Sequence, residues 1–141
     1  MNKITTFTLS ILSVMIWIGC SHTVIESEEN TSWVFVANEG NLGEHNGTIS
    51  MIDDFGNVIE TEPLGKVVHS LEVYGNKLIV LVNKSHKINI YNITPEGLSM
   101  PGIEISTKGS EPRDLAILDL EGTENDKIYF TNWISQDIKV F

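Results

Sequence analysis

The sequence carries the run FVAN at residues 35–38, VLVN at residues 80–83 and YFTN at residues 129–132. Most residues of these runs are β-branched or aromatic, each run closes on Asn, and the closing Asn residues are 45 and then 49 positions apart. Such residues favour strands, and Asn ends a strand readily because its side chain bonds nearby backbone and tolerates left-handed angles. The recurrence indicates an internal repeat built of strands.

Further strand-like runs surround these three. We expect strands after them at residues 48–53, 87–91 and 137–141, before the second and third at residues 69–74 and 113–118, and between units at residues 57–61 and 102–106. Four short strands in roughly 40–50 residues is the period of a β-propeller blade. The sequence therefore predicts an all-β fold, a β-propeller of four-stranded blades, with about two and a half blades at residues 33–64, 65–108 and 109–141.

The central strand of each unit gives a second test of this prediction. Residues 34–37, 78–82 and 128–131 are apolar or Thr at consecutive positions, without polar alternation. An uninterrupted apolar run is typical of a strand covered on both faces. A propeller provides such cover because each blade lies between two neighbours.

The run at residues 129–132 resembles the Tyr-Val-Thr-Asn core of YVTN-repeat (YncE-like) propellers. Its continuation SQDIKVF at residues 135–141 is similar to the following strand of that family, whereas the runs at residues 35–38 and 80–83 depart further from the motif. The resemblance covers about residues 33–141. It implies the propeller fold and says little about the ligand.

The N-terminal residues have the character of an export signal. Residues 4–19 are apolar or hydroxylic, and Lys3 is the only charged residue before Cys20. Such a helix rises about 24 Å, short of a hydrocarbon core of about 30 Å. The sequence therefore predicts a cleaved signal peptide at residues 1–19.

The end of this segment, Ile18-Gly19-Cys20-Ser21, resembles the lipobox of bacterial lipoproteins, although Trp17 departs from the usual aliphatic residue. The resemblance implies diacylation of Cys20, membrane attachment through it, and a place in the bacterial cell envelope, periplasmic or surface-exposed. Residues 20–32 would then be the lipidated Cys and an acidic tether. The alternative is a secretory peptide and a free or buried thiol.

Charge and cysteine content exclude several classes of function. The chain has 141 residues with 9 basic and 19 acidic side chains, a net charge of −10, which argues against a nucleic-acid partner. One cysteine excludes an intramolecular disulfide, a cysteine-based zinc site and covalently attached haem.

Two and a half blades do not close a ring, and the sequence stops at Phe141 within an expected strand. We therefore expect the chain to be the N-terminal part of a longer protein. The alternative is a short chain that completes a ring by oligomerising.

Candidate site residues gather at one rim of the predicted propeller, where the first strand of a blade begins and the second ends. They are His69 and Arg113 at the strand starts, and Asn38, Glu39, Asn83, Lys84, Asn132 and Trp133 at the turns. Such side chains can bind an anionic or polar ligand. Each also has a structural interpretation: Asn as a strand end, His or Arg as a contact between blades, Trp as packing.

Two functions remain open from the sequence. The first is a lipid-anchored, non-enzymatic binding or scaffolding module whose ligand is a small molecule, a glycan or another protein, with no cofactor. The second is a propeller enzyme, similar to metal-dependent lactonases and lyases or to dehydrogenase subunits, in which His69 and Glu39 contribute to a divalent metal site. No catalytic residue and no metal site is assigned from the sequence.

Overall fold

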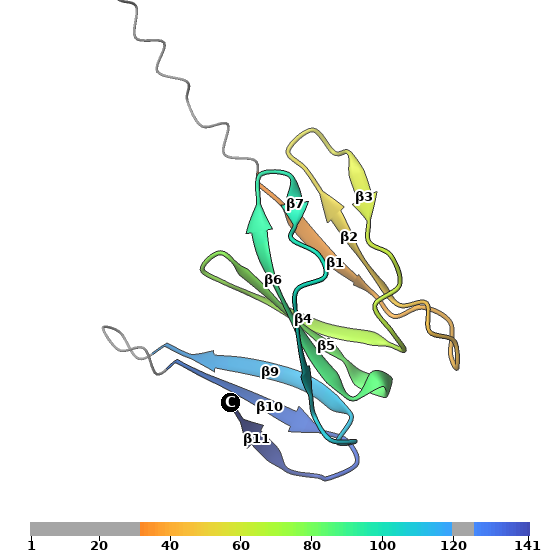
Figure 1. Ribbon diagram of the computed structural model, residues 1–141, viewed down its shortest axis with the longest axis vertical. Helices are drawn as coiled ribbons and strands as arrows, with labels where there is room; N and C mark the ends of the chain where they lie inside the picture. The colour runs from red at the N-terminus through yellow and green to blue at the C-terminus, as the bar shows by residue number, and fades with distance from the viewer. Residues whose placement is uncertain (1–31, 120–125) are drawn as a thin grey trace, which may run out of the picture.

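A computed structural model of the chain describes residues 32–119 and 126–141. These residues form β-strands, turns and one short 3-10 helix, and no α-helix occurs among them. The all-β prediction is therefore confirmed for the described part of the chain. The strands form three antiparallel sheets that follow one another along the long axis of the molecule (Figure 1).

The first and third sheets each have three strands, in the orders β1-β2-β3 and β11-β10-β9. The first sheet consists of β1 (Val34–Asn38), β2 (Thr48–Ile52) and β3 (Val58–Glu60). The third consists of β9 (Pro112–Leu118), β10 (Lys127–Asn132) and β11 (Ile138–Val140).

The middle sheet contains five strands. They are β4 (Val68–Tyr74), β5 (Lys77–Val82), β6 (Lys87–Thr94), β7 (Gly97–Leu98) and β8 (Ile103–Ser106). β8 pairs with the first half of β6 and β7 with its end. The sequence did not predict β7, because a strand of two residues is too short to carry a hydrophobic pattern. The 3-10 helix η1 (Asn83–Ser85) joins β5 to β6.

Two apolar clusters lie on opposite sides of β5. One contains Leu78, Val80 and Val82 together with buried residues of the first sheet, and the other contains Ile79 and Leu81 together with Phe130 of the third sheet. The prediction that both faces are covered is therefore confirmed for β5. Strands β1 and β10 belong to the outer sheets, so one face of each packs on the middle sheet and the other face is partly exposed.

Strands β4 and β9 begin in the same way, which shows the repeat at the level of the backbone. Val67 and Glu111 both have positive φ, at 58° and 52°, and their carbonyls accept from the amides of Asn83 and Trp133 at 2.9 Å. A β-bulge follows in each strand, between Val68 and Ser70 in β4 and opposite Phe130 and Asn132 in β9. Bulges bend a strand and redirect a side chain, and here they fall at the predicted site residues His69 and Arg113.

Strand pairing corrects the alignment of the middle repeat by one residue. Val82 pairs with Val68 on one side and with Lys87 on the other. Asn132 has the same two neighbours in the third sheet, since it pairs with Pro112 and its backbone amide donates to the carbonyl of Asp137. The position that matches Asn132 is therefore Val82, and Asn83 lies one residue beyond it. An uninterrupted apolar run has no alternation to fix its register, so the sequence motif alone could not reveal the offset.

Candidate functional site

The predicted site residues lie at one end of the sheets, which we call the rim: β1, β5 and β10 end there, and β4 and β9 begin there (right side of Figure 1). The antiparallel order of each sheet brings these ends together. The rim side chains fall into separate groups: contacts between adjacent sheets, one hollow, and two sets of hydrogen bonds at strand ends.

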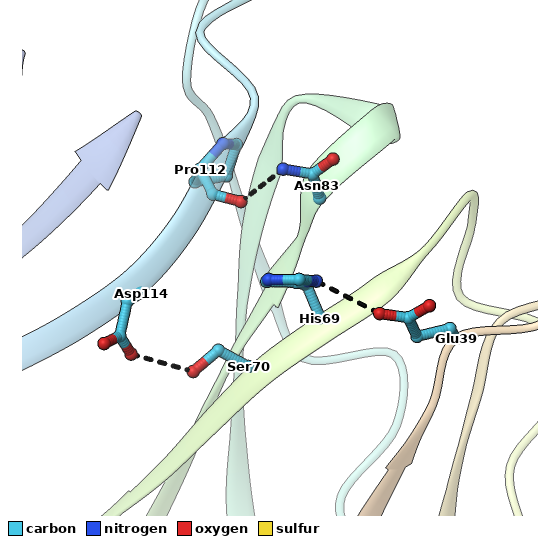
Figure 2. A network of polar contacts seen from close by, with 6 residues as sticks. All are labelled: Glu39, His69, Ser70, Asn83, Pro112 and Asp114. Atoms are coloured by element: carbon cyan, nitrogen blue, oxygen red, sulfur yellow. Dashed lines mark hydrogen bonds and ion pairs between the residues drawn. The ribbon is translucent and has the colours of Figure 1, made fainter. Parts of the chain in front are cut away.

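Glu39 and His69 connect the first sheet to the middle sheet. The Nδ1 atom of His69 lies 3.2 Å from Oε1 of Glu39 (Figure 2). The Glu39 side chain is largely exposed. The bulge at His69 turns its ring toward the end of β1. A single, partly exposed contact of this kind contributes little to stability, so either side chain can exchange it for a contact with a ligand at low cost.

Asn83 makes the corresponding contact between the middle and third sheets. Its Nδ2 atom donates to the carbonyl oxygen of Pro112 at 2.8 Å (Figure 2). Asn83 is buried. Beside it, Nζ of Lys84 lies 2.6 Å from Oε2 of Glu111. Glu111 is nearly buried whereas Lys84 is half-exposed. Burial protects this ion pair from solvent screening, so it holds the start of β9 against η1.

Arg113 and Trp133 lie next to each other at the rim, beside η1. The guanidinium carbon of Arg113 lies 4.3 Å from the centroid of the Trp133 ring, a distance that permits a cation–π contact. Trp133 is 60% exposed. A hollow of about 240 Å³ lies between the third sheet and η1, and it is lined by Asn83, Lys84, Glu111, Arg113 and Trp133. Two cations and one carboxylate give the hollow a local positive charge in an acidic chain.

Ser70 and Asp114 add a weaker contact across the middle and third sheets. The hydroxyl of Ser70 lies 3.4 Å from Oδ1 of Asp114 (Figure 2). Asp114 also accepts from the amide of Leu115 at 3.0 Å. The two residues occupy matching positions one residue after His69 and Arg113, so the bulges place polar side chains side by side at the rim.

Asn38 and Asn132 have partners within their own sheets. Asn38 donates to the hydroxyls of Thr48 and Ser50 at 3.1 and 2.9 Å. Buried Asn132 accepts from the hydroxyl of Ser110 at 2.6 Å and donates to Oδ1 of Asp137 at 2.9 Å. The structure places both at strand ends, apart from the residues that line the hollow.

Asp137 is held in its charged form by these contacts. Its pKa is lowered from the ordinary value, first by a hydrogen bond from the Ser135 hydroxyl and further by the bond from Asn132 and the charge of Lys139. The charged carboxylate is therefore a fixed part of the β10–β11 turn.

Several rim residues were not predicted from the sequence. Glu111 and Pro112 contact the predicted residues Lys84 and Asn83, and Ser70 and Asp114 contact each other. All four lie within two residues of His69 or Arg113 in the chain, but the sequence does not show which neighbours a bulge turns inward. Across residues 32–119 and 126–141, no group of three or more His, Cys, Asp or Glu side chains is arranged to hold a metal ion.

The predicted signal peptide at residues 1–19, the lipidation residue Cys20 and all but the last residue of the tether lie outside the described residues. Ser32 is described, and its amide donates to Oδ2 of Asp54 at 2.9 Å. None of the described segments forms a helix of the length and apolarity that a membrane crossing requires. Neither the protein-family models nor the curated proteins with which the chain was compared match it.

Proposed function

We propose that the chain is a binding module of the bacterial cell envelope, in which the three sheets are successive blades of a YVTN-like propeller and Cys20 carries the lipid anchor. The strand numbers of the sheets support the propeller. The first and third sheets have three strands each, and the middle sheet has four and the short strand β7, which is the order expected for consecutive blades. The lipobox-like sequence at residues 18–21 supports the anchor.

The rim hollow is the observation that carries the proposed binding function. The exposed face of Trp133 offers a flat apolar surface, Arg113 and Lys84 offer positive charge and donors, and Glu111 offers an acceptor. Small-ligand sites combine an aromatic surface with a few polar groups that fix orientation. A small polyol or sugar that carries a carboxylate has the matching chemistry, because its ring can stack on Trp133 and its charge can pair with Arg113.

A fluorescence titration of the full chain with glucuronate, and with glucose as the neutral counterpart, tests this function. We expect a saturable change in tryptophan emission with glucuronate and a weaker response to glucose. Arg113→Ala should weaken glucuronate binding about tenfold or more, since a hydrogen bond to a charged group is worth about 1.5–3 kcal/mol.

Matched tryptophan variants locate the signal. Trp133→Phe should abolish the change, whereas Trp33→Phe should retain it, because the Trp33 indole donates to the Thr94 carbonyl away from the hollow. No saturable response to glucuronate, or a response that Arg113→Ala leaves intact, would contradict a site for a carboxylated sugar at this hollow.

A further inference from the structure

Each sheet has two faces, and in the middle sheet both of them are packed against a neighbouring sheet. Leu78, Val80 and Val82 of β5 pack toward the first sheet, and Ile79 and Leu81 pack toward the third. We call the side toward the earlier sheet the backward face and the side toward the later sheet the forward face. The molecule thus contains the same joint twice, the forward face of one sheet against the backward face of the next.

Strand pairing identifies the matching positions in the outer sheets. Because Asn38, Val82 and Asn132 match, Val36 of β1 corresponds to Val80 of β5 and lies on the backward face of the first sheet. Ile138 of β11 corresponds to Ile88 of β6 and lies on the forward face of the third. The inward faces of both outer sheets, with Phe35 and Phe130 among their residues, are already packed against the middle sheet.

The two outward faces carry apolar side chains that are exposed. Val36 is 41% exposed, whereas Val80 at the matching position of the middle sheet is 0% exposed. Ile138 is 69% exposed, whereas the matching Ile88 is 0% exposed. The exposed apolar neighbours are Val34 and Val58 on the backward face of the first sheet, and Leu118 and Val140 on the forward face of the third. Exposed apolar side chains that gather on one face of a sheet are typical of an interaction site.

The forward face of the third sheet is also hollowed. A mostly apolar depression of about 190 Å³ is lined by Asp114, Leu115, Ala116, Tyr129, Phe130, Thr131 and Ile138. Tyr129 and Thr131 lie on the side of β10 that corresponds to Ile79 and Leu81 of β5. The depression therefore occupies the place where, between the middle and third sheets, side chains of the next sheet are packed.

We propose that the forward face of the third sheet binds the backward face of the first sheet of a second copy of this chain. This head-to-tail joint repeats the arrangement that the molecule already uses between its own sheets, with Val36 of one copy against Ile138 of another. Pairing of two forward faces or of two backward faces has no counterpart inside the molecule. The joint is heterologous, so successive copies add in one direction until a ring closes or a chain extends.

Sedimentation analysis of the full chain over a range of concentrations tests the proposal. We expect the average mass of the wild type to rise above that of a monomer. Val36→Asp and Ile138→Asp should each remain monomeric, because every joint needs one intact face of each kind. An equimolar mixture of the two variants should form a species of twice the monomer mass, since one intact forward face meets one intact backward face.

Controls separate this joint from other causes of association. Leu42→Asp alters a side chain that is 92% exposed in the β1–β2 loop, outside both faces, and should associate like the wild type. All variants keep residues 1–31, so association through that segment would persist in each of them. Thermal unfolding checks that the variants are folded, and Val34→Asp with Val140→Asp forms a second pair if either first variant is not.

A wild type that stays monomeric overturns the proposal, as does a single variant that associates like the wild type or a mixture that stays monomeric. The proposal does not rest on ligand binding at the rim. The rim hollow and the depression on the forward face of the third sheet have no lining residue in common.

Discussion

At the scale of single residues, Tyr74 shows how one hydrogen bond fixes a protonation state. Its hydroxyl donates to Oδ2 of Asp126 at 2.8 Å, which ties the end of β4 to the start of β10. The pKa of Tyr74 is raised from 10.0 to about 12, first by this bond, then by desolvation and by the charges of Asp119 and Asp126. The neutral phenol is the form that the folded chain stabilises.

We therefore predict that stability falls as the pH rises from 10 toward 12. Below pH 10 both the folded and the unfolded chain hold the phenol proton, whereas between pH 10 and 12 only the folded chain keeps it, so deprotonation favours unfolding. A phenolate absorbance titration of wild type and Tyr74→Phe should differ by one group that titrates near pH 12. In Asp126→Asn this group should titrate closer to pH 10; an unchanged titration there would contradict the assigned cause.

The Asn residues show what the sequence could predict at this scale and what it could not. Their recurrence predicted strand ends, and Asn38 and Asn132 do end β1 and β10. Asn83 instead begins η1 and contacts Pro112 of the next sheet. Side chains that cross between sheets depend on the packing of the sheets, which a local motif does not encode.

At the scale of elements, hydrophobic patterning located most strands. The expected strands at residues 69–74 and 113–118 agree with β4 and β9 to one residue, whereas β6 continues three residues beyond the expected 87–91. The extension pairs Ile93 with Leu98 of β7. Asn92 and Thr94 interrupt the apolar pattern there, so hydrophobic patterning alone does not predict that the strand continues.

The loss of stability when a strand side chain is truncated should depend on whether the strand face is covered, and not on the residue type alone. Val80→Ala should lower the free energy of unfolding by about 1.5–3 kcal/mol, because Val80 is fully buried between two sheets. Val36→Ala, the same change at the matching position of β1, should cost clearly less because Val36 is already partly in water. Urea denaturation measures both values; equal costs would mean that the face of β1 is covered in solution as well.

At the scale of the whole molecule, the three sheets should differ in how readily they open. The middle sheet is covered on both faces, and β5 pairs with a strand on each side. The outer sheets are each held by one inter-sheet cluster, and β1 and β11 pair with one strand each. Opening an outer sheet breaks one joint, whereas opening the middle sheet breaks two.

Amide hydrogen exchange should therefore follow this order along the chain. We predict that the amides of Leu78–Val82 in β5 exchange slowest, near the rate set by global unfolding, that those of β10 are intermediate, and that those of β1 and β11 are fastest. The measurement is best made on dilute Val36→Asp, because association of the wild type would cover the outer sheets. If the amides of β1 and β11 exchange slowly in the wild type at high concentration but fast in this variant, the head-to-tail joint protects them. If these amides exchange as slowly as those of β5 in the variant, the exposed outward faces do not make the outer sheets open more readily. The argument from coverage would then be wrong.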